Sequence, residues 1–136
     1  MGVEQGFRVR ATELGHVSLY VRDLEASVRF YRDVLGLRET GRGKGGRIAF
    51  LSTGAHHHDV SLEAARAEGG IPPKGAPGLY HIAFHIGSGR EELAAARRAL
   101  ERQGFAPFGD AEGSHPCFCV TDPDGHTIEL YVDAKS

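Results

Sequence analysis

The stretch LGHVSL at residues 14–19 decides the fold, because a matching stretch, LYHIAF, recurs at residues 79–84 and places His81 65 positions after His16. Later parts of the two halves also correspond, with Ser61 matching Glu129 at an offset of 68 positions. The change of three positions indicates a small insertion in a helix or loop of the second half, where insertions are tolerated. The chain is therefore predicted to be a tandem repeat of one structural unit.

Each half predicts the same order of elements, namely a strand, a helix and three further strands. In the first half, Asp23 is a typical helix N-cap and Gly36 a typical helix end. The expected segments are module one at about 13–64 (strand 14–21, helix 24–35, strands 37–42, 47–52 and 57–63), a glycine- and proline-rich linker at about 65–77, and module two at about 78–132 (strand 79–86, helix 90–103 and three strand candidates).

One β-α-β-β-β unit covers a single face of its curved sheet with its own helix and leaves the other face bare. Two units must therefore pair around a cavity. The predicted fold class is α+β, in which residues 1–136 form one domain and two tandem βαβββ modules make a half-closed mixed β barrel around a cavity, with the helices outside.

The composition is that of an ordinary soluble domain, with 40% hydrophobic and 25% charged residues and a formal net charge of −2. This balance gives no general attraction to nucleic acids or anionic membranes, so a small-molecule substrate is expected instead. No stretch approaches the ~20 apolar residues of a membrane span, and residues 1–12 lack a secretory core, so a cytoplasmic location is expected. Cys117 and Cys119 are expected to face opposite sides of a strand and to stay reduced.

The alternation of side chains along the strands predicts which residues enter the cavity. The apolar neighbours of His16 must lie under the helix, so His16 faces the concave side of its sheet, and His81 does the same in the second half. In the last strand Glu129 belongs to the polar face. Two imidazoles and one carboxylate with open coordination positions suit Fe(II), and Mn(II), Ni(II) or Zn(II) can also use them.

A structural role is the alternative for each of these residues taken alone. A lone inward histidine or glutamate is more often a hydrogen-bonded core residue or a surface residue than a metal ligand. A glutamate between apolar strand neighbours is costly to bury unless it is paired or metal-bound, which favours a ligand role for Glu129. The sequence pattern by itself leaves open whether the three side chains meet.

Four segments together resemble the vicinal oxygen chelate superfamily, which includes glyoxalase I, bleomycin-resistance proteins, fosfomycin-resistance transferases and extradiol dioxygenases. They are GHVSL at 15–19, SVRFYRDVLGL at 27–37, YHIAF at 80–84 and DPDGHTIEL at 122–130. The resemblance covers about residues 13–132. It implies a paired βαβββ barrel and metal ligands at His16, His81 and Glu129.

The resemblance also bears on the reaction. Glyoxalase I has a fourth metal ligand, usually glutamate, where this sequence has Ser61, which argues against an ordinary glyoxalase I. Bleomycin-binding members commonly lack the metal triad, so an intact triad argues against a purely drug-binding role. Extradiol dioxygenases carry a histidine in a segment that resembles HDV at 58–60, which implies that His58 is the catalytic acid/base. His58 must then sit at the start of its strand, because it cannot face inward on one regular strand together with Ser61. These dioxygenases have a tyrosine where this sequence has Cys119, so the match is incomplete.

The expected function is a divalent-metal-dependent enzyme, an extradiol-type dioxygenase that cleaves a catechol-like substrate with O2 and uses Fe(II). The alternatives are a glyoxalase-like isomerase or lyase acting through a metal-bound enolate, and a non-catalytic drug- or metabolite-binding resistance protein. The resemblance further implies a homodimer. Whether the site forms within one chain or across two stays open at this point.

Overall fold

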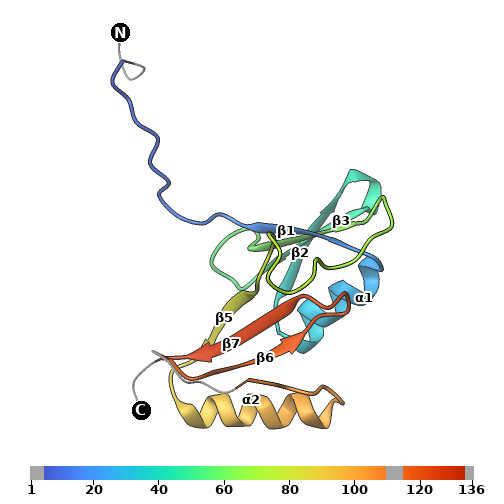
Figure 1. Ribbon diagram of the computed structural model, residues 1–136, viewed down its shortest axis with the longest axis vertical. Helices are drawn as coiled ribbons and strands as arrows, with labels where there is room; N and C mark the ends of the chain where they lie inside the picture. Colours follow the sequence, from blue (N-terminus) through green and yellow to red (C-terminus); the bar gives the residue numbers. More distant parts are fainter. Residues whose placement is uncertain (1–4, 110–114, 134–136) are drawn as a thin grey trace.

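The computed structural model describes residues 5–109 and 115–133, and its elements follow the order of the predicted repeat (Figure 1). Module one consists of β1 (Val17–Val21), α1 (Leu24–Arg29) with its π-helical continuation η2 (Phe30–Val34), β2 (Arg38–Gly43), the 3-10 turn η3 (Lys44–Gly46), β3 (Ile48–Ser52) and β4 (Val60–Ala64). Module two consists of β5 (Ile82–Gly87), α2 (Arg90–Arg102), β6 (Cys117–Thr121) and β7 (Thr127–Val132).

The strands form two mixed sheets, in the orders β1-β4-β3-β2 and β5-β7-β6. In each module the first strand pairs in parallel with the last, and the others pair antiparallel. Ser18 lies opposite Ser61 in the first parallel pair, and Ala83 lies opposite Glu129 in the second. The register thus reproduces the offsets of 65 and 68 read from the sequence. The α+β fold is confirmed, as two open sheets rather than a closed barrel.

Module two departs from the prediction in its strand number. Within the described residues, α2 is followed by an isolated bridge between Phe108 and Cys119 and then by β6 and β7. The backbone of Phe108 both donates to and accepts from Cys119, so this segment pairs at only one position. The prediction of three strands after α2 is therefore corrected to two strands and a bridge, while residues 110–114 lie outside the described part of the chain.

The two cysteines also depart from their prediction. Cys117 lies opposite Tyr131 and Cys119 opposite Glu129, while the intervening Phe118 is buried in the core. Both thiols therefore share one face of β6, because residues two apart in a strand point the same way. They are free in the structure.

The helices cover the apolar faces of the sheets, as the alternation predicts. Asp23 caps α1 by accepting a hydrogen bond from the Ala26 amide at 3.1 Å. Val28 and Tyr31 follow at helical spacing and are buried with Leu62 of β4 in one core that also contains Phe118 and Ile128 of module two. No helix of the described chain is long and apolar enough to cross a membrane.

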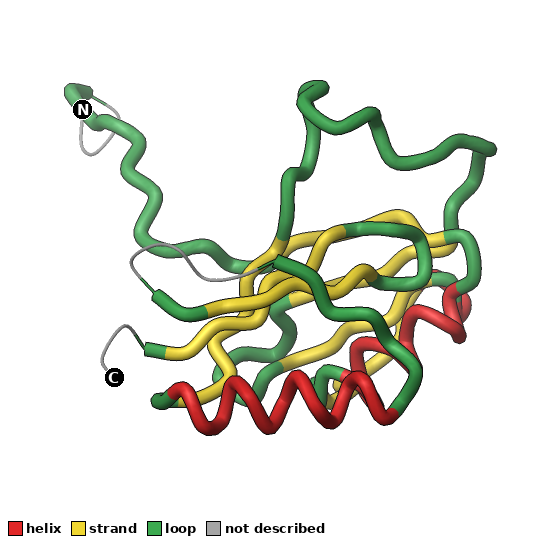
Figure 2. The backbone as a smooth tube through the Cα atoms, turned by 60° about the horizontal axis from the view of Figure 1, so that its bottom comes forward, coloured by secondary structure: helices red, strands yellow, loops and turns green. Residues whose placement is uncertain are grey.

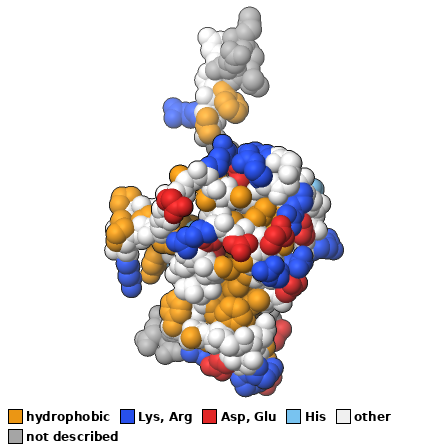
Figure 3. Space-filling model, turned by 90° about the vertical axis from the view of Figure 1, so that its right-hand side faces the viewer, with side chains coloured by type: hydrophobic (Ala, Val, Ile, Leu, Met, Phe, Trp, Pro, Cys, Tyr) orange, Lys and Arg blue, Asp and Glu red, His pale blue; other side chains and the backbone are white. Residues whose placement is uncertain are grey.

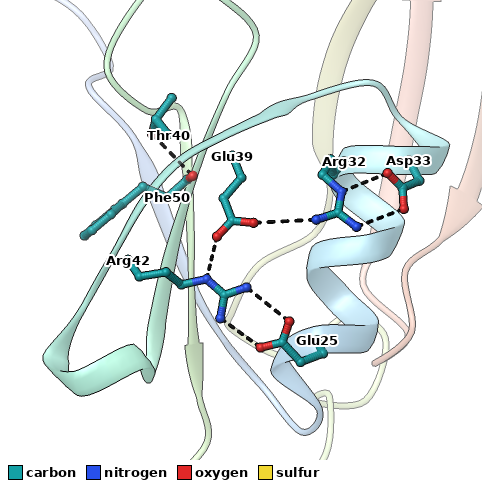
Figure 4. A network of polar contacts seen from close by, with 7 residues as sticks. All are labelled: Glu25, Arg32, Asp33, Glu39, Thr40, Arg42 and Phe50. Carbon is teal, nitrogen blue, oxygen red and sulfur yellow. Dashed lines mark hydrogen bonds and ion pairs between the residues drawn. The ribbon is translucent and has the colours of Figure 1, made fainter.

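The surface is charged but carries no field of one sign on the face drawn in Figure 3, where basic and acidic side chains alternate. An ion-pair network joins α1, η2 and β2 (Figure 4). Arg42 of β2 bonds Glu25 of α1 with both terminal nitrogens and also contacts Glu39, which in turn pairs with Arg32. Because these side chains are at least partly exposed, each pair contributes little to stability.

A buried carboxylate joins the two modules. The Tyr31 hydroxyl of module one donates to Oδ2 of Asp122 in the β6–β7 turn at 2.8 Å, and both side chains are almost fully buried. His126 Nδ1 bonds the same oxygen at 2.8 Å, and the amides of Asp124 and His126 donate to Oδ1. The DPDG turn thus docks module two onto the helix of module one.

Tyr31→Phe is expected to lower the free energy of unfolding by about 1.5–3 kcal/mol, because it removes a hydrogen bond to a buried charge. Urea denaturation followed by circular dichroism measures this. Tyr80→Phe is the matched control, since Tyr80 is 75% exposed, and it is expected to shift stability by less than about 0.5 kcal/mol. Equal effects of the two variants would contradict the role given to the Tyr31 hydroxyl.

The same contact predicts a pH dependence of stability. The Asp122 carboxylate raises the pKa of His126, while burial acts to raise the pKa of Asp122 but is outweighed by hydrogen bonds from His126 and Tyr31, which hold it below its ordinary value. The His126 contribution is complete below its unfolded pKa of about 6.5 and is lost as the pH rises through its higher folded pKa. The Asp122 contribution is present above about pH 4 and is lost as the pH falls through its lower folded pKa.

Stability from this pair should therefore be greatest between about pH 4 and 6.5 and should decline above it. His126→Asn removes the titrating group, so the variant should be less stable at pH 6 and should lack this decline. Urea denaturation of both proteins between pH 5 and 9 checks this. A wild-type decline that persists unchanged in His126→Asn would assign the dependence to another group.

Candidate functional site

Glu129 lies on β7, the central strand of the second sheet, between β5 and β6. Its neighbours Ile128 and Leu130 are buried in the core, so strand alternation turns Glu129 to the opposite face. Its side chain is only 15% exposed. The position is fixed on both sides, by Ala83 of β5 and Cys119 of β6.

His81 lies directly before β5 and reaches the same carboxylate. Its Nε2 is 3.6 Å from Oε1 of Glu129, and its ring packs against Tyr80 with the ring centres 4.6 Å apart. The structure therefore brings together two of the three residues that the sequence predicts as ligands.

A second histidine contacts the other oxygen of Glu129. His115 Nε2 is 3.3 Å from Oε2, and its ring lies 4.6 Å from that of Tyr131. His115 is not among the residues that the sequence predicts as ligands. Strand parity carries a signal for it, because Cys117 and Cys119 share the face of β6 beside Glu129 and His115 precedes β6 at the same spacing of two.

The other two predicted residues lie in module one. His16 is exposed and directly precedes β1, and its ring centre is 4.6 Å from that of His58. His58 also packs on Phe50 at 4.8 Å, and its Nδ1 is 2.8 Å from Nδ1 of His57. Burial, together with His16 and His57, lowers the pKa of His58. His58 lies two residues ahead of β4, just before the strand start at which it was predicted.

The predicted ligand set is thus divided between the modules. Within residues 5–109 and 115–133, no three histidine, cysteine, aspartate or glutamate side chains come together as a group that could hold a metal ion. His81 and Glu129 form one half-site in module two, and His16 with His58 forms another in module one. Each half lies at the face of its sheet that the module's own helix leaves uncovered.

Ser61 shows why the two modules are not chemically equivalent. It occupies the position that corresponds to Glu129, and its hydroxyl is hydrogen-bonded to that of Ser18 on the paired strand. Ser61 is also almost fully buried. The hydroxyl is therefore engaged within its own sheet, and module one offers no carboxylate at this position.

A cavity of about 660 Å³ opens beside the half-site of module two. The loop between β4 and β5 arches over the strands (Figure 2) and forms one wall. His81, Cys119, Thr127 and Glu129 lie on the opposite wall. Burial and the Glu129 carboxylate raise the pKa of the Cys119 thiol, so Cys119 faces the cavity as a neutral group.

The donor set fits a divalent transition metal. Two histidine nitrogens and one carboxylate suit Fe(II), Mn(II), Ni(II) and Zn(II), and leave coordination positions for a substrate. Glu129 is poorly exposed and lies 3.6 Å from the His81 ring nitrogen, an arrangement that a bound cation would stabilise. His81 and Glu129 supply two donors from this chain, and His16 is the third predicted donor.

Comparison with known proteins places this geometry in context. The family model described as the Glyoxalase/Bleomycin resistance protein/Dioxygenase superfamily matches residues 13–130. Catechol-2,3-dioxygenase of Bacillus subtilis (strain 168) is 33% identical over 90% of this chain, which spans only 42% of that relative. Glutathione transferase FosA of Serratia marcescens is 32% identical over 88% of this chain and 79% of its own length.

Solved structures agree on the fold. A glyoxalase/dioxygenase from Nostoc punctiforme superposes with a TM-score of 0.77, at 24% identity, over 93% of this chain and 97% of that one. The named relatives are mostly enzymes, including a catechol dioxygenase, a metapyrocatechase and a lactoylglutathione lyase. With the family model spanning both modules, the chain belongs to the glyoxalase/bleomycin resistance protein/dioxygenase superfamily.

Proposed function

We propose that this protein is a divalent-metal-dependent enzyme of the extradiol dioxygenase type, which opens a catechol-like substrate with O2. The observation that carries the proposal is the Glu129 carboxylate, held beside His81 on the wall of a cavity. Fe(II) is the favoured ion, since two imidazoles and a carboxylate are the ligands that oxygen-activating iron uses. Three of the matching relatives are named as catechol dioxygenases or metapyrocatechases.

We further propose that the third ligand, His16, comes from the partner in a homodimer. Several large side chains near the two half-sites are exposed although they are apolar: Leu14, Tyr20, Leu79, Tyr80 and Phe108. A two-fold axis that places module one of each chain against module two of its partner would cover such side chains and unite His16 with His81 and Glu129. Two identical sites per dimer would result.

In this arrangement each residue has a distinct task. Bound metal would supply a Lewis acid that lowers the pKa of the substrate hydroxyls. His58, next to His16, would accept a proton from the substrate and return it to the product, with Phe50 holding its ring in place. The loop residues of the cavity wall would exclude water from the opposite side.

Two observations favour a second candidate, a metal-dependent transferase, isomerase or lyase. Cys119 stands at the cavity wall where the dioxygenase resemblance calls for tyrosine, and a thiol cannot give the same phenolic hydrogen bond. This chain also spans 79% of the FosA transferase but only 42% of the Bacillus dioxygenase. A protein that only binds a drug or metabolite is the remaining alternative.

Metal loading and oxygen consumption test the leading proposal. After anaerobic reconstitution with Fe(II), we expect one ion per chain by elemental analysis and O2 uptake with substituted catechols. His81→Ala should weaken metal affinity by more than the roughly 10–100-fold that loss of an outer-sphere partner costs. Metal binding without O2 uptake would favour the second candidate. If the protein binds no metal, and His16→Ala binds the ligand as tightly as the wild type does, the enzyme proposal is wrong. The protein would then only bind a drug or metabolite.

Subunit mixing tests the shared site. His16→Ala and Glu129→Ala should each abolish tight metal binding, because every site then lacks one ligand. When the two variants are unfolded, mixed in equal amounts and refolded, half of the dimers carry one intact site of two, so about a quarter of the wild-type metal content should return. A site formed within one chain predicts no recovery. His81→Ala mixed with Glu129→Ala is the control, since both changes fall on the same half-site.

A further inference from the structure

The loop between β4 and β5, which arches over the strands in Figure 2, brings Lys74 into the lining of the Glu129 cavity. His81 and Glu129 line the same cavity. Its volume of about 660 Å³ lies within the range of about 300–1,000 Å³ that small-molecule sites have. A ligand that fills this one space therefore meets both Lys74 and the half-site of module two.

Lys74 occupies the second position of a tight turn. The Ala76 amide donates a hydrogen bond to the Pro73 carbonyl at 2.9 Å, and Gly75, the third residue of the turn, has a φ of 92°. A type II turn requires a positive φ at this position, and glycine adopts it without steric cost. The sequence PPKG at 72–75 thus places the backbone of Lys74 at the tip of a defined turn.

Two close approaches fix where the loop carries this turn. A methyl group built on Gly125, in the β6–β7 turn, would lie 3.7 Å from Cγ1 of Ile71. One built on Gly78 would lie 3.4 Å from Cγ of Pro72, so the segments on either side of the turn approach each other. The loop is therefore packed against module two just ahead of Lys74 and against itself around the turn.

The charges of the cavity leave the ammonium of Lys74 to a ligand. Among the described residues that line the cavity, Lys74 is the one lysine or arginine and Glu129 the one aspartate or glutamate. Both oxygens of Glu129 are already contacted by imidazoles, at 3.6 Å from His81 and 3.3 Å from His115. In the described part of the chain the ammonium makes no ion pair or hydrogen bond. Its three donors are therefore available to an acceptor that a ligand brings into the cavity.

We propose that Lys74 is a specificity-determining residue, which selects substrates with a carboxylate on the ring whose vicinal oxygens lie at His81 and Glu129. The identity of the ligand as the substrate rests on the proposed function. An ammonium attracts a carboxylate more strongly in a cavity that excludes part of the water than it does in bulk solvent. Acidic catechols therefore bind more tightly than neutral ones of the same shape. Lys74 does not belong to the exposed apolar side chains assigned to the dimer contact.

The test compares 3,4-dihydroxybenzoate with 3,4-dihydroxybenzamide, which has nearly the same shape but no charge, by anaerobic calorimetry on the Fe(II)-loaded protein. The wild type should bind the acid roughly tenfold more tightly than the amide. Lys74→Gln should lose this preference by weakening the acid alone, and Lys74→Arg should keep it. Unchanged affinity for the amide shows that the variants are folded. Arg98→Gln removes an exposed cation of α2 outside the cavity and should change neither affinity.

Equal affinity of the wild type for the two ligands would overturn the proposal, as would a preference for the acid that persists in Lys74→Gln or a loss that the amide shares. The proposed function fails separately, if Fe(II) strengthens the binding of neither ligand. In that case the two affinities of the metal-free protein, measured by NMR titration, decide about Lys74 alone. Preference for the acid that Lys74→Gln removes would still support its role, and absence of binding by both ligands would overturn it.

Discussion

The buried carboxylate of Asp122 is the contact on which the arrangement of the molecule depends. It accepts hydrogen bonds from Tyr31 of module one and from the ring and amide of His126 in module two. Because no polar atom at such depth can be left unpaired without cost, the turn has one favourable position against the helix. Glu129 follows three residues after His126, so the docking of the modules also sets where β7 presents its carboxylate.

Two copies of one unit have acquired different roles through a few positions in the same register. In module one Ser18 and Ser61 satisfy each other across the β1–β4 pair. In module two the matching pair is Ala83 and Glu129, so the small methyl group leaves the carboxylate to the cavity and to His81. The backbone is common to both units, and the chemistry depends on which side chain occupies the central strand.

Much of this could be predicted from the sequence, because strand parity and repeat offsets are local properties. They place His81 and Glu129 on the same face of their sheet, where the two side chains meet, and they place His58 near the start of β4. The expected opposite orientation of Cys117 and Cys119 was wrong, because residues two apart in a strand share one face, here the face away from the core. The role of His115 and the shortened strand at Phe108 were missed, since both depend on pairing between distant segments.

The separation of His16 from Glu129 could not be predicted from the sequence, because the same two modules can close on each other within a chain or across a dimer. The alternation of side chains determines which residues lie on each face of a sheet, but it does not determine which module faces which. The contact between Tyr31 and Asp122 sets the helix side of module one against module two, and within the described residues no three candidate ligands come together. If the third ligand comes from a partner, metal binding and association stabilise each other by mass action. The metal would then select the dimer, and the dimer would complete the metal site.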